Sequence, residues 1–229
     1  MIAVRVLPAG DSAWLIELPE RIEAAINTRA IRIARDVQAA GLPVTDVVVG
    51  YRSVMVYIDP LSDGATGIET RLLGIASAAS PDASTPGALV EVPVCYDGPY
   101  GPDLRDVAAF GGCSIEDVIA LHLGREYRVF VVGFVPGFAY MAPVDPRIAA
   151  PRRTSPRLKV PAGSVAVAAG QTGVYPAETP GGWSLIGRCP VKPYDADRAE
   201  PFLFHPGDGV RFQRISESEY KRATEWGDA

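Results

Sequence analysis

The first 80 residues alternate between stretches with a two-residue apolar period and stretches with a helical one. Short apolar runs predict strands at 3–7, 13–18, 45–49 and 54–58. Residues 20–40 predict a helix, because apolar side chains recur near one helical face: Ile22, Ile26, Ile33 and Val37. Gly41 can then take the left-handed conformation that ends many helices, and 66–78 predicts a second helix. The order ββαββα predicts a small α+β sandwich with two helices on one face of the sheet.

A run of small residues and prolines, SAASPDASTPGA at 77–88, carries no apolar period and predicts a domain boundary. It divides the chain into an N-terminal domain over 1–80 and a C-terminal domain over 88–229. We therefore expect two small domains, each with a core of its own.

The C-terminal half begins with a predicted strand at 89–94, and Asp103 is expected to cap a short helix that ends near Phe110. Ser114 opens another helix, with Asp117 in the reciprocal capping position. From Tyr127 onward the helical signals stop. Short β-rich runs alternate there with glycine and proline loops and predict a closed or nearly closed β-barrel: 127–134, 164–168, 184–188 and 209–214.

Composition excludes several classes of protein. The formal net charge is -5, which gives no overall attraction to nucleic acid or anionic lipid. No run approaches the roughly 18 apolar residues of a membrane span, and Asp11 and Glu17 interrupt the N-terminus too early for a signal peptide. The three cysteines lie far apart without a CxxC pair, which indicates a reducing, cytoplasmic location. Two distant histidines predict no metal site.

Candidate chemistry concentrates between residues 133 and 188, where bases and aromatics alternate with glycine and proline. Arg157 and Lys159 lie in the chain's one concentrated basic run, and they predict a site for an anionic substrate or a nucleotide. Arg152 and Arg153 belong to the same run, but they fit equally well a solvated loop with partners such as Asp145.

The other candidates each have two interpretations. Trp183 is either the floor of a pocket or a core aromatic, and Glu178 is either a general base or a solvated loop acid. His122 is either an active-site group that titrates near neutrality or a polar cap at a helix end, and His205 is a turn residue. Side chains of the GQTGVYP stretch are suited to orienting a ligand through neutral hydrogen bonds: Gln171, Thr172 and Tyr175.

Five motifs occur in an order that resembles the KipI family, also known as allophanate hydrolase subunit 1 and as the B subunit of 5-oxoprolinase. They are PVCYDGPYGPDL, GFVPGFAYMAPVDPRI, PRLKVPAGSVAVA, GQTGVYPAETPGGWSLIGR and FLFHPGDGVRF. The resemblance is dense over 92–212 and loose in the N-terminal domain. The chain departs from the pattern at Ala142 and Pro143, where glycines are expected, and at His205.

The resemblance implies a small N-terminal α+β domain followed by a cyclophilin-like β-barrel. It implies one subunit of an ATP-dependent 5-oxoprolinase, which opens 5-oxoproline to L-glutamate together with two further subunits, one KipA-like and one LamB/YcsF-like. ATP with Mg2+ is expected at the level of the complex, and this chain alone is expected to be inactive. Two alternatives are an inhibitor of a histidine kinase that docks through an apolar GFVPGFAYM patch, and half of a urea-carboxylase-like carboxyltransferase.

These observations lead to a predicted site. We expect catalytic roles for His122 and Glu178. We expect substrate-binding roles for residues of the loops: Phe134, Pro136, Gly137, Phe138, Arg157, Lys159, Gly163, Gln171, Thr172, Tyr175, Gly182 and Trp183. Tyr140 joins Phe134, Phe138 and Trp183 as a loop aromatic expected to be exposed until a partner protein covers it.

Overall fold

The structure is a computed structural model that describes residues 4–80 and 87–227, with side chains through residue 224. The chain forms two compact units, Met1–Pro86 and Gly87–Ala229. The predicted boundary segment at 77–88 includes residues 81–86, which lie outside the described residues. No helix within the described ranges is both long and apolar enough to cross a membrane.

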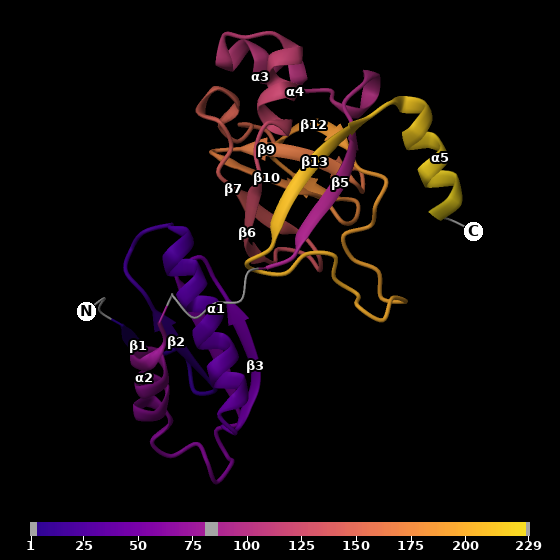
Figure 1. The fold of residues 1–229 in the computed structure, drawn as a ribbon. Helices are drawn as coiled ribbons and strands as arrows, with labels where there is room; N and C mark the ends of the chain where they lie inside the picture. The colour runs from indigo at the N-terminus through magenta and orange to yellow at the C-terminus, as the bar shows by residue number, and fades with distance from the viewer. Residues whose placement is uncertain (1–3, 81–86, 228–229) are drawn as a thin grey trace. The chain divides into compact units, whose positions relative to one another are not determined.

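The first unit is a four-stranded antiparallel sheet covered by two helices (Figure 1), which confirms the predicted ββαββα order. The sheet order is β1-β2-β4-β3, with strands β1 (Arg5–Pro8), β2 (Ala13–Glu17), β3 (Val44–Val49) and β4 (Ser53–Ile58). The helices are α1 (Ala24–Ala39) and α2 (Ile68–Ala78). Alternate residues of β4 (Val54, Val56 and Ile58) are buried, so a single sheet face meets the helices.

One prediction for this unit was wrong at the start of α1. The helix begins at Ala24, because Glu23 has an extended backbone with φ -128° and ψ 144°. Ile22 therefore precedes the helix and is 64% exposed instead of packing on the helical face. At the other end Gly41 has φ +61°, as predicted for the residue that ends this helix.

The second unit is built around a closed seven-stranded barrel, which confirms the predicted closure. The strand order is β10-β7-β6-β13-β5-β12-β9. The strands are β5 (Leu89–Cys95), β6 (Tyr127–Val132), β7 (Ala139–Ala142), β9 (Ser164–Ala168), β10 (Gln171–Val174), β12 (Ser184–Arg188) and β13 (Gly209–Ile215). Strands β5 and β13 pair in parallel over seven residues, so segments from near the two ends of this unit lie side by side.

Two short helices, α3 (Leu104–Gly111) and α4 (Ile115–Leu123), lie together at one end of the barrel in Figure 1. The predicted capping box of α4 is present: the Asp117 N–H donates to Ser114 Oγ at 3.1 Å, and the Ser114 N–H donates to Asp117 Oδ2 at 2.9 Å. Two 3-10 turns, η2 (Gly98–Tyr100) and η3 (Pro146–Ile148), connect elements nearby.

The expectation that helices stop after Tyr127 was wrong, because helix α5 (Glu217–Gly227) follows the last strand. Ser216 and Glu219 cap its start reciprocally, with the Glu219 N–H donating to Ser216 Oγ at 3.3 Å. This is the same Ser-x-x-acid signature that identifies α4, so the sequence did contain the signal.

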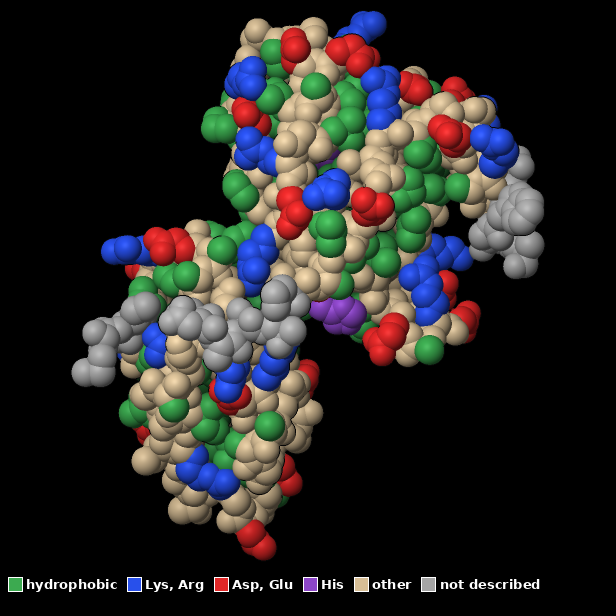
Figure 2. Space-filling model, in the orientation of Figure 1, with side chains coloured by type: hydrophobic (Ala, Val, Ile, Leu, Met, Phe, Trp, Pro, Cys, Tyr) green, Lys and Arg blue, Asp and Glu red, His purple; other side chains and the backbone are tan. Residues whose placement is uncertain are grey.

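A separate two-stranded ladder pairs β8 (Arg157–Val160) with β11 (Thr179–Gly181). The sequence did not indicate these two strands, or β7 and β10, because glycine and proline are unfavourable inside strands and both are frequent in this region. Acidic and basic side chains are interspersed over the face of each unit seen in Figure 2, with hydrophobic side chains between them.

Candidate functional site

Five aromatic side chains from distant parts of the second unit meet around Phe138. The ring centroids of Tyr140, Tyr175, Trp183 and Phe134 lie 4.8, 5.1, 5.5 and 5.8 Å from that of Phe138, and each meets it edge-on. Edge-to-face contacts of this kind stabilise aromatic clusters beyond simple area burial. The cluster rests on aliphatic side chains of the barrel and of β8: Val160, Ala166 and Leu185.

The prediction that Phe134, Phe138, Tyr140 and Trp183 are exposed in the isolated chain was largely wrong. Phe138 and Trp183 are only 1% and 4% exposed, and Tyr140 is partly buried. Phe134 alone among them is mostly exposed, at 62%, and its φ of +70° ends strand β6 early. The GFVPGFAYM stretch is therefore not a continuous apolar surface, because its central residues pack inward and only a few near Phe134 face outward.

Beside the cluster, a buried carboxylate holds two arginines. Asp103, which is 3% exposed, accepts hydrogen bonds from Arg157 Nη2 at 2.7 Å and from Arg153 Nη1 at 3.4 Å, both on Oδ1. Its Oδ2 accepts from the Leu185 N–H at 2.7 Å. Asp103 does occupy the N-cap position of α3, but its side chain makes no capping bond, so the predicted capping role of that side chain was wrong.

Each of these two arginines has one N–H donor without a hydrogen-bond partner among the described residues. These donors are Arg157 Nη1 and Arg153 Nε, and both are buried. Buried polar groups are rarely left unpaired, and such exceptions concentrate at functional sites or at sites of bound solvent and ions. The exposed Arg152 places its guanidinium 5.9 Å from the centroid of the Trp183 ring, so a third positive charge lies at the aromatic cluster.

Burial raises the pKa of Tyr140 and of Tyr175, while the positive charge of Arg152 opposes the rise at both. The neighbouring Tyr140 further raises the pKa of Tyr175, because two phenolates side by side would repel each other, whereas the positive charge of Arg157 lowers it. These couplings show that the arginines and the tyrosines share one electrostatic environment. Both phenols stay protonated at neutral pH and can donate hydrogen bonds.

The β8–β11 ladder, whose Val160 belongs to the aromatic cluster, also carries an exposed ion pair. Lys159 Nζ lies 3.0 Å from Glu178 Oε1, and their side chains are 78% and 56% exposed. An exposed pair of this kind contributes little to stability, so both groups are free to rearrange around a ligand. Leu158, between the two bases of β8, is 87% exposed.

His122 lies inside the barrel, away from these groups. It is fully buried, its Nδ1 is 2.8 Å from Tyr96 Oη, and its Nε2 is 2.9 Å from Thr172 Oγ1. Because the Thr172 hydroxyl donates to the Ala166 carbonyl, it accepts from Nε2–H, and Nδ1 accepts from Tyr96. Burial lowers the pKa of His122 to about 3, so the imidazole is neutral. This geometry favours a structural role for His122 and Thr172, and their predicted site roles stay untested predictions.

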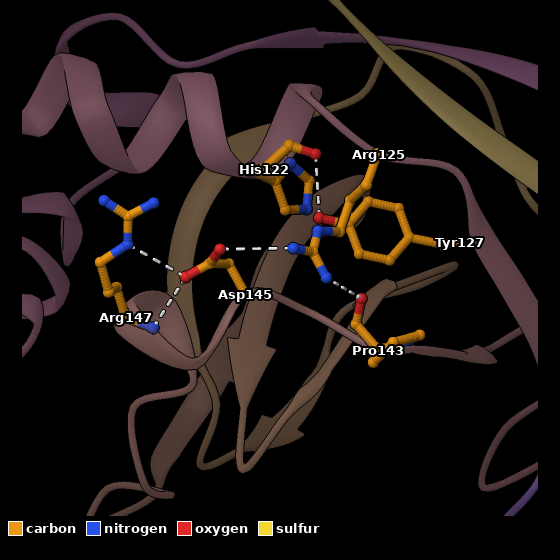
Figure 3. Close-up of polar contacts among 6 residues, drawn as sticks. All are labelled: His122, Arg125, Tyr127, Pro143, Asp145 and Arg147. Atoms are coloured by element: carbon orange, nitrogen blue, oxygen red, sulfur yellow. Dashed lines mark hydrogen bonds and ion pairs between the residues drawn. The ribbon is translucent and has the colours of Figure 1, made fainter.

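Figure 3 shows the hydrogen bonds of Asp145 together with the one that the His122 carbonyl accepts. The Tyr127 hydroxyl donates to the His122 carbonyl at 2.9 Å, and nearby Asp145 accepts from Arg147 and Arg125. Hydrogen bonds from the Arg147 backbone and side chain hold the pKa of Asp145 below its usual value. Asp145 is therefore engaged elsewhere and is not the partner of Arg152 or Arg153 that the sequence suggested.

Other predicted binding residues lie outside the cluster or have a structural reason of their own. Gly163 has φ +76°, and a Cβ there would collide with the Cys189 carbonyl. Gly137 has φ +85° and packs against Tyr194, Pro136 is exposed beside it, and Gln171 begins β10. Gly182 does lie at the cluster, where its carbonyl accepts from the Arg153 N–H at 2.8 Å.

A separate pocket of about 530 Å3 opens between α3, α4 and β13. Its polar walls include Asp97 and Glu116, which both pair with Arg214, and also the exposed Arg105. Within the described ranges, no group of three or more histidine, cysteine or acidic side chains is placed to hold a metal ion.

The cluster and its surroundings thus combine three guanidinium groups, two protonated phenols and the Asp103 carboxylate on a mostly apolar base. The exposed Lys159–Glu178 pair lies on the adjoining β8–β11 ladder. Such a surface can bind an anionic group and exclude water from it. Asp103, Arg152, Arg153 and Tyr140 belong to this constellation although the sequence did not assign them to the site. No local signal links Asp103 to arginines that lie 50 and 54 positions further along the chain.

Comparison with known proteins places the chain in a family. Residues 4–204 match the family model described as carboxyltransferase domain, subdomain C and D. The chain is 38% identical to the 5-oxoprolinase B subunit of Bacillus subtilis strain 168 over 226 residues, which cover 92% of each protein. It is 40% identical to the 5-oxoprolinase B subunit of Escherichia coli O157:H7 over 207 residues, which cover 89% of this chain and 92% of that protein.

Solved structures share the fold. The crystal structure of TTHA0988 superposes with a TM-score of 0.78 at 38% identity, over 93% of this chain but only 40% of that one. The Kluyveromyces lactis urea amidolyase superposes with a TM-score of 0.81 over 98% of this chain and 16% of that one, at 20% identity, which shows the fold alone. The chain belongs to the carboxyltransferase subdomain C and D family, among the proteins named as the B subunit of 5-oxoprolinase.

Proposed function

We propose that this chain is one subunit of an ATP-dependent 5-oxoprolinase, which opens 5-oxoproline to L-glutamate with a KipA-like and a LamB/YcsF-like subunit. The observation that carries the proposal is its 38–40% identity, over about 90% of its length, to proteins named as the B subunit of 5-oxoprolinase. The basic and aromatic cluster supports it, because 5-oxoproline is a small, flat, monoanionic ring.

Hydrolysis of a five-membered lactam needs activation of a stable amide. ATP, a second substrate that normally travels with Mg2+, can provide it when the amide oxygen attacks the γ-phosphorus and ADP leaves. Water then adds to the activated carbon, the ring C–N bond breaks, and phosphate and glutamate are released. We assign ATP to the complex as a whole and not to this chain in particular.

In this scheme the chain's residues bind and orient the substrate. The partly exposed guanidinium groups of Arg157 and Arg153 are suited to the carboxylate of 5-oxoproline, and the ring can lie against the edge of the aromatic cluster. The protonated Tyr140 and Tyr175 hydroxyls can donate to developing negative charge. Glu178 is the acid at the exposed edge, where it can position water once a ligand separates it from Lys159.

The site also calls for a partner surface. Phe134 and Leu158 expose apolar side chains beside a cluster that is otherwise buried, and an opposing protein can cover them and exclude water. The chain spans only about 40% of TTHA0988, so in that relative a single polypeptide carries this fold together with a larger remainder.

The test is reconstitution. The chain is co-purified with its presumed partners, and glutamate is measured after addition of 5-oxoproline and ATP, with each component omitted in turn. We expect glutamate only from the complete mixture. A folded, stable complex of all three proteins that forms no glutamate would refute the proposal, and turnover by this chain alone would refute its dependence on partners.

A second candidate is a carboxyltransferase component. It is favoured by the description of the matching family model and by a 28% identical stretch of 137 residues in a putative urea carboxylase of Emericella nidulans. The same purified complex, supplied with a biotin-dependent carboxylase and urea, distinguishes the two. Carboxyl transfer to urea without glutamate formation would support this candidate over the first.

A further inference from the structure

The aromatic cluster has more positive than negative charge beside it. Three arginines lie at its edge, Arg152, Arg153 and Arg157, and one buried carboxylate, Asp103, faces them. Arg153 and Arg157 both donate to the same oxygen of Asp103, Oδ1, and Oδ2 accepts from the Leu185 N–H. Both oxygens of this carboxylate are therefore occupied, and the three arginines with the one aspartate keep a net charge of +2.

Arg152 is the arginine of this group that no carboxylate neutralises. Its side chain is exposed, and no acidic side chain in the described part of the chain forms an ion pair with it. Asp145, the partner that the sequence suggested, pairs with Arg125 and Arg147 instead. Exposed arginines without an ion pair are common on protein surfaces, so the case for a site depends on where Arg152 lies.

The backbone on both sides of Arg152 is fixed by hydrogen bonds. Before it, the Ala150 carbonyl accepts from the Ala169 N–H at 2.8 Å, and after it, the Arg153 N–H donates to the Gly182 carbonyl at 2.8 Å. The first bond ties the segment to the turn between β9 and β10, and the second ties it to the start of β12. The backbone thus holds Arg152 at the aromatic cluster whichever rotamer its side chain adopts.

At the cluster, Arg152 lies beside both aromatic surface and hydroxyl groups. Its guanidinium carbon is 5.9 Å from the centroid of the Trp183 ring. Burial raises the pKa of Tyr140 and of Tyr175, and the positive charge of Arg152 opposes the rise at both. Tyr140 is partly exposed, and Phe134 is 62% exposed. An accessible guanidinium, a phenol donor and an apolar ring edge therefore occur together at the outer part of the cluster.

We propose that Arg152 binds the carboxylate of the substrate and makes the site select a carboxylate over a neutral lactam. The substrate class is a small flat ring with one carboxylate, and the ring lies against the exposed edge of the cluster at Phe134 and Tyr140. The other two arginines stay on Asp103 and provide a fixed positive surface, whereas Arg152 turns toward the ligand. A guanidinium suits this role because it donates two parallel N–H bonds to a carboxylate. The inference rests on the proposed oxoprolinase function for the identity of the ligand.

The competing explanation is that Arg152 only packs on Trp183. A guanidinium beside an indole ring stabilises a fold slightly and needs no ligand. In that case, loss of Arg152 should affect the binding of charged and neutral ligands alike. Packing also leaves the net charge of +2 unexplained, because contact with an aromatic ring does not neutralise a cation.

The test is ligand titration of the isolated full chain, labelled with 15N and observed at the indole N–H resonance of Trp183. Trp183→Phe identifies this resonance by its absence. The probes are 5-oxoproline and 2-pyrrolidinone, which is the same lactam ring without the carboxylate, at equal ionic strength. We expect 5-oxoproline to shift the resonance saturably and to bind at least about 10-fold more tightly than 2-pyrrolidinone. This is the lower end of the effect expected for one charge-assisted contact, since Arg152 is exposed.

Three variants assign the preference to a residue. Arg152→Gln should remove it, and Arg152→Lys should keep part of it, because an ammonium retains the charge without the planar pair of donors. Arg105→Gln removes another exposed arginine, at the separate pocket beside α3, and should keep the full preference as the matched control. An Arg152→Gln chain with an unchanged Tm and the full preference would overturn the inference. A wild-type chain that binds neither probe, or both equally, would overturn it as well.

The reconstituted complex gives a second readout, where Arg152→Gln should raise the KM for 5-oxoproline about 10-fold. The inference and the proposed function can fail separately. A wild-type complex that makes no glutamate, together with carboxylate binding that depends on Arg152, would remove the function and leave the anion site. Glutamate formation together with an unchanged carboxylate preference in Arg152→Gln would remove the role of Arg152 and leave the function.

Discussion

The carboxylate of Asp103 should control the stability of the site, and Asp103→Asn isolates its contribution. In the structure Oδ1 accepts from Arg157 and Arg153, and Oδ2 accepts from the Leu185 N–H. An asparagine offers only one acceptor oxygen. Whichever way its amide is turned, an NH2 group will face either the Leu185 N–H or the arginines, so one contact becomes donor against donor.

The magnitude follows from burial. Losing a hydrogen bond to a charged group and leaving a donor unpaired cost about 1–3 kcal/mol each, and breaking a buried ion pair costs about 3–5 kcal/mol. The Arg157 side chain is 26% exposed, which lets water compensate in part. We therefore expect Asp103→Asn to lower the local stability around β12 by about 2–3 kcal/mol.

Native-state hydrogen exchange at the Leu185 amide measures this directly. A loss of about 2 kcal/mol corresponds to roughly 30-fold faster exchange when exchange follows the opening equilibrium. Asp106→Asn, on the exposed side of the same helix, is the matched control and should cost at most about 0.5 kcal/mol. Equal exchange at Leu185 in wild type and Asp103→Asn would refute the assigned hydrogen bond and the role of Asp103 as the anchor of both arginines.

Three further predictions concern pH, backbone shape and turnover. The unfolded imidazole of His122 titrates near pH 6.5 and the folded one near 3, so the folded chain should lose stability as pH falls below 6.5, by about 2 kcal/mol at pH 5. Urea unfolding should show that His122→Gln removes this component and that exposed His205→Gln does not. Gly163→Ala should lower the Tm more than Gly170→Ala, because both have positive φ but only Gly163 lies against a backbone carbonyl; equal losses would contradict this. Arg157→Ala should reduce the kcat/KM of a reconstituted oxoprolinase about 10- to 150-fold and lower the Tm as well, since Asp103 loses its closest donor; unchanged kcat/KM would remove Arg157 from the site.

Local sequence determined much of the secondary structure. The strands at Ser164–Ala168 and Ser184–Arg188 begin and end where the apolar runs do, and the α4 capping box forms as its Ser-x-x-Asp pattern predicts. These features depend on neighbouring residues only, through side-chain alternation and hydrogen bonds that span three positions. The motif order likewise sufficed to indicate the family, because motifs are read along the chain.

The composition of the site depended on contacts that no local pattern contains. Asp103 has the sequence context of a helix cap, yet folding brings it to Arg157 and to the Leu185 N–H, 54 and 82 positions away. Phe138 and Trp183 sit in glycine-rich loops that suggest exposure, but each is buried by the other and by Val160.

Charge and exposure of individual groups were likewise decided by the tertiary structure. A histidine at a helix end in sequence is equally consistent with a titrating group and with a core residue. Closure of the barrel around His122 removes water from it, and without water the protonated imidazole loses its solvation and becomes costly. Burial is a property of the whole fold, so the roles of His122 and Asp103 became visible only once the strands and helices were assembled around them.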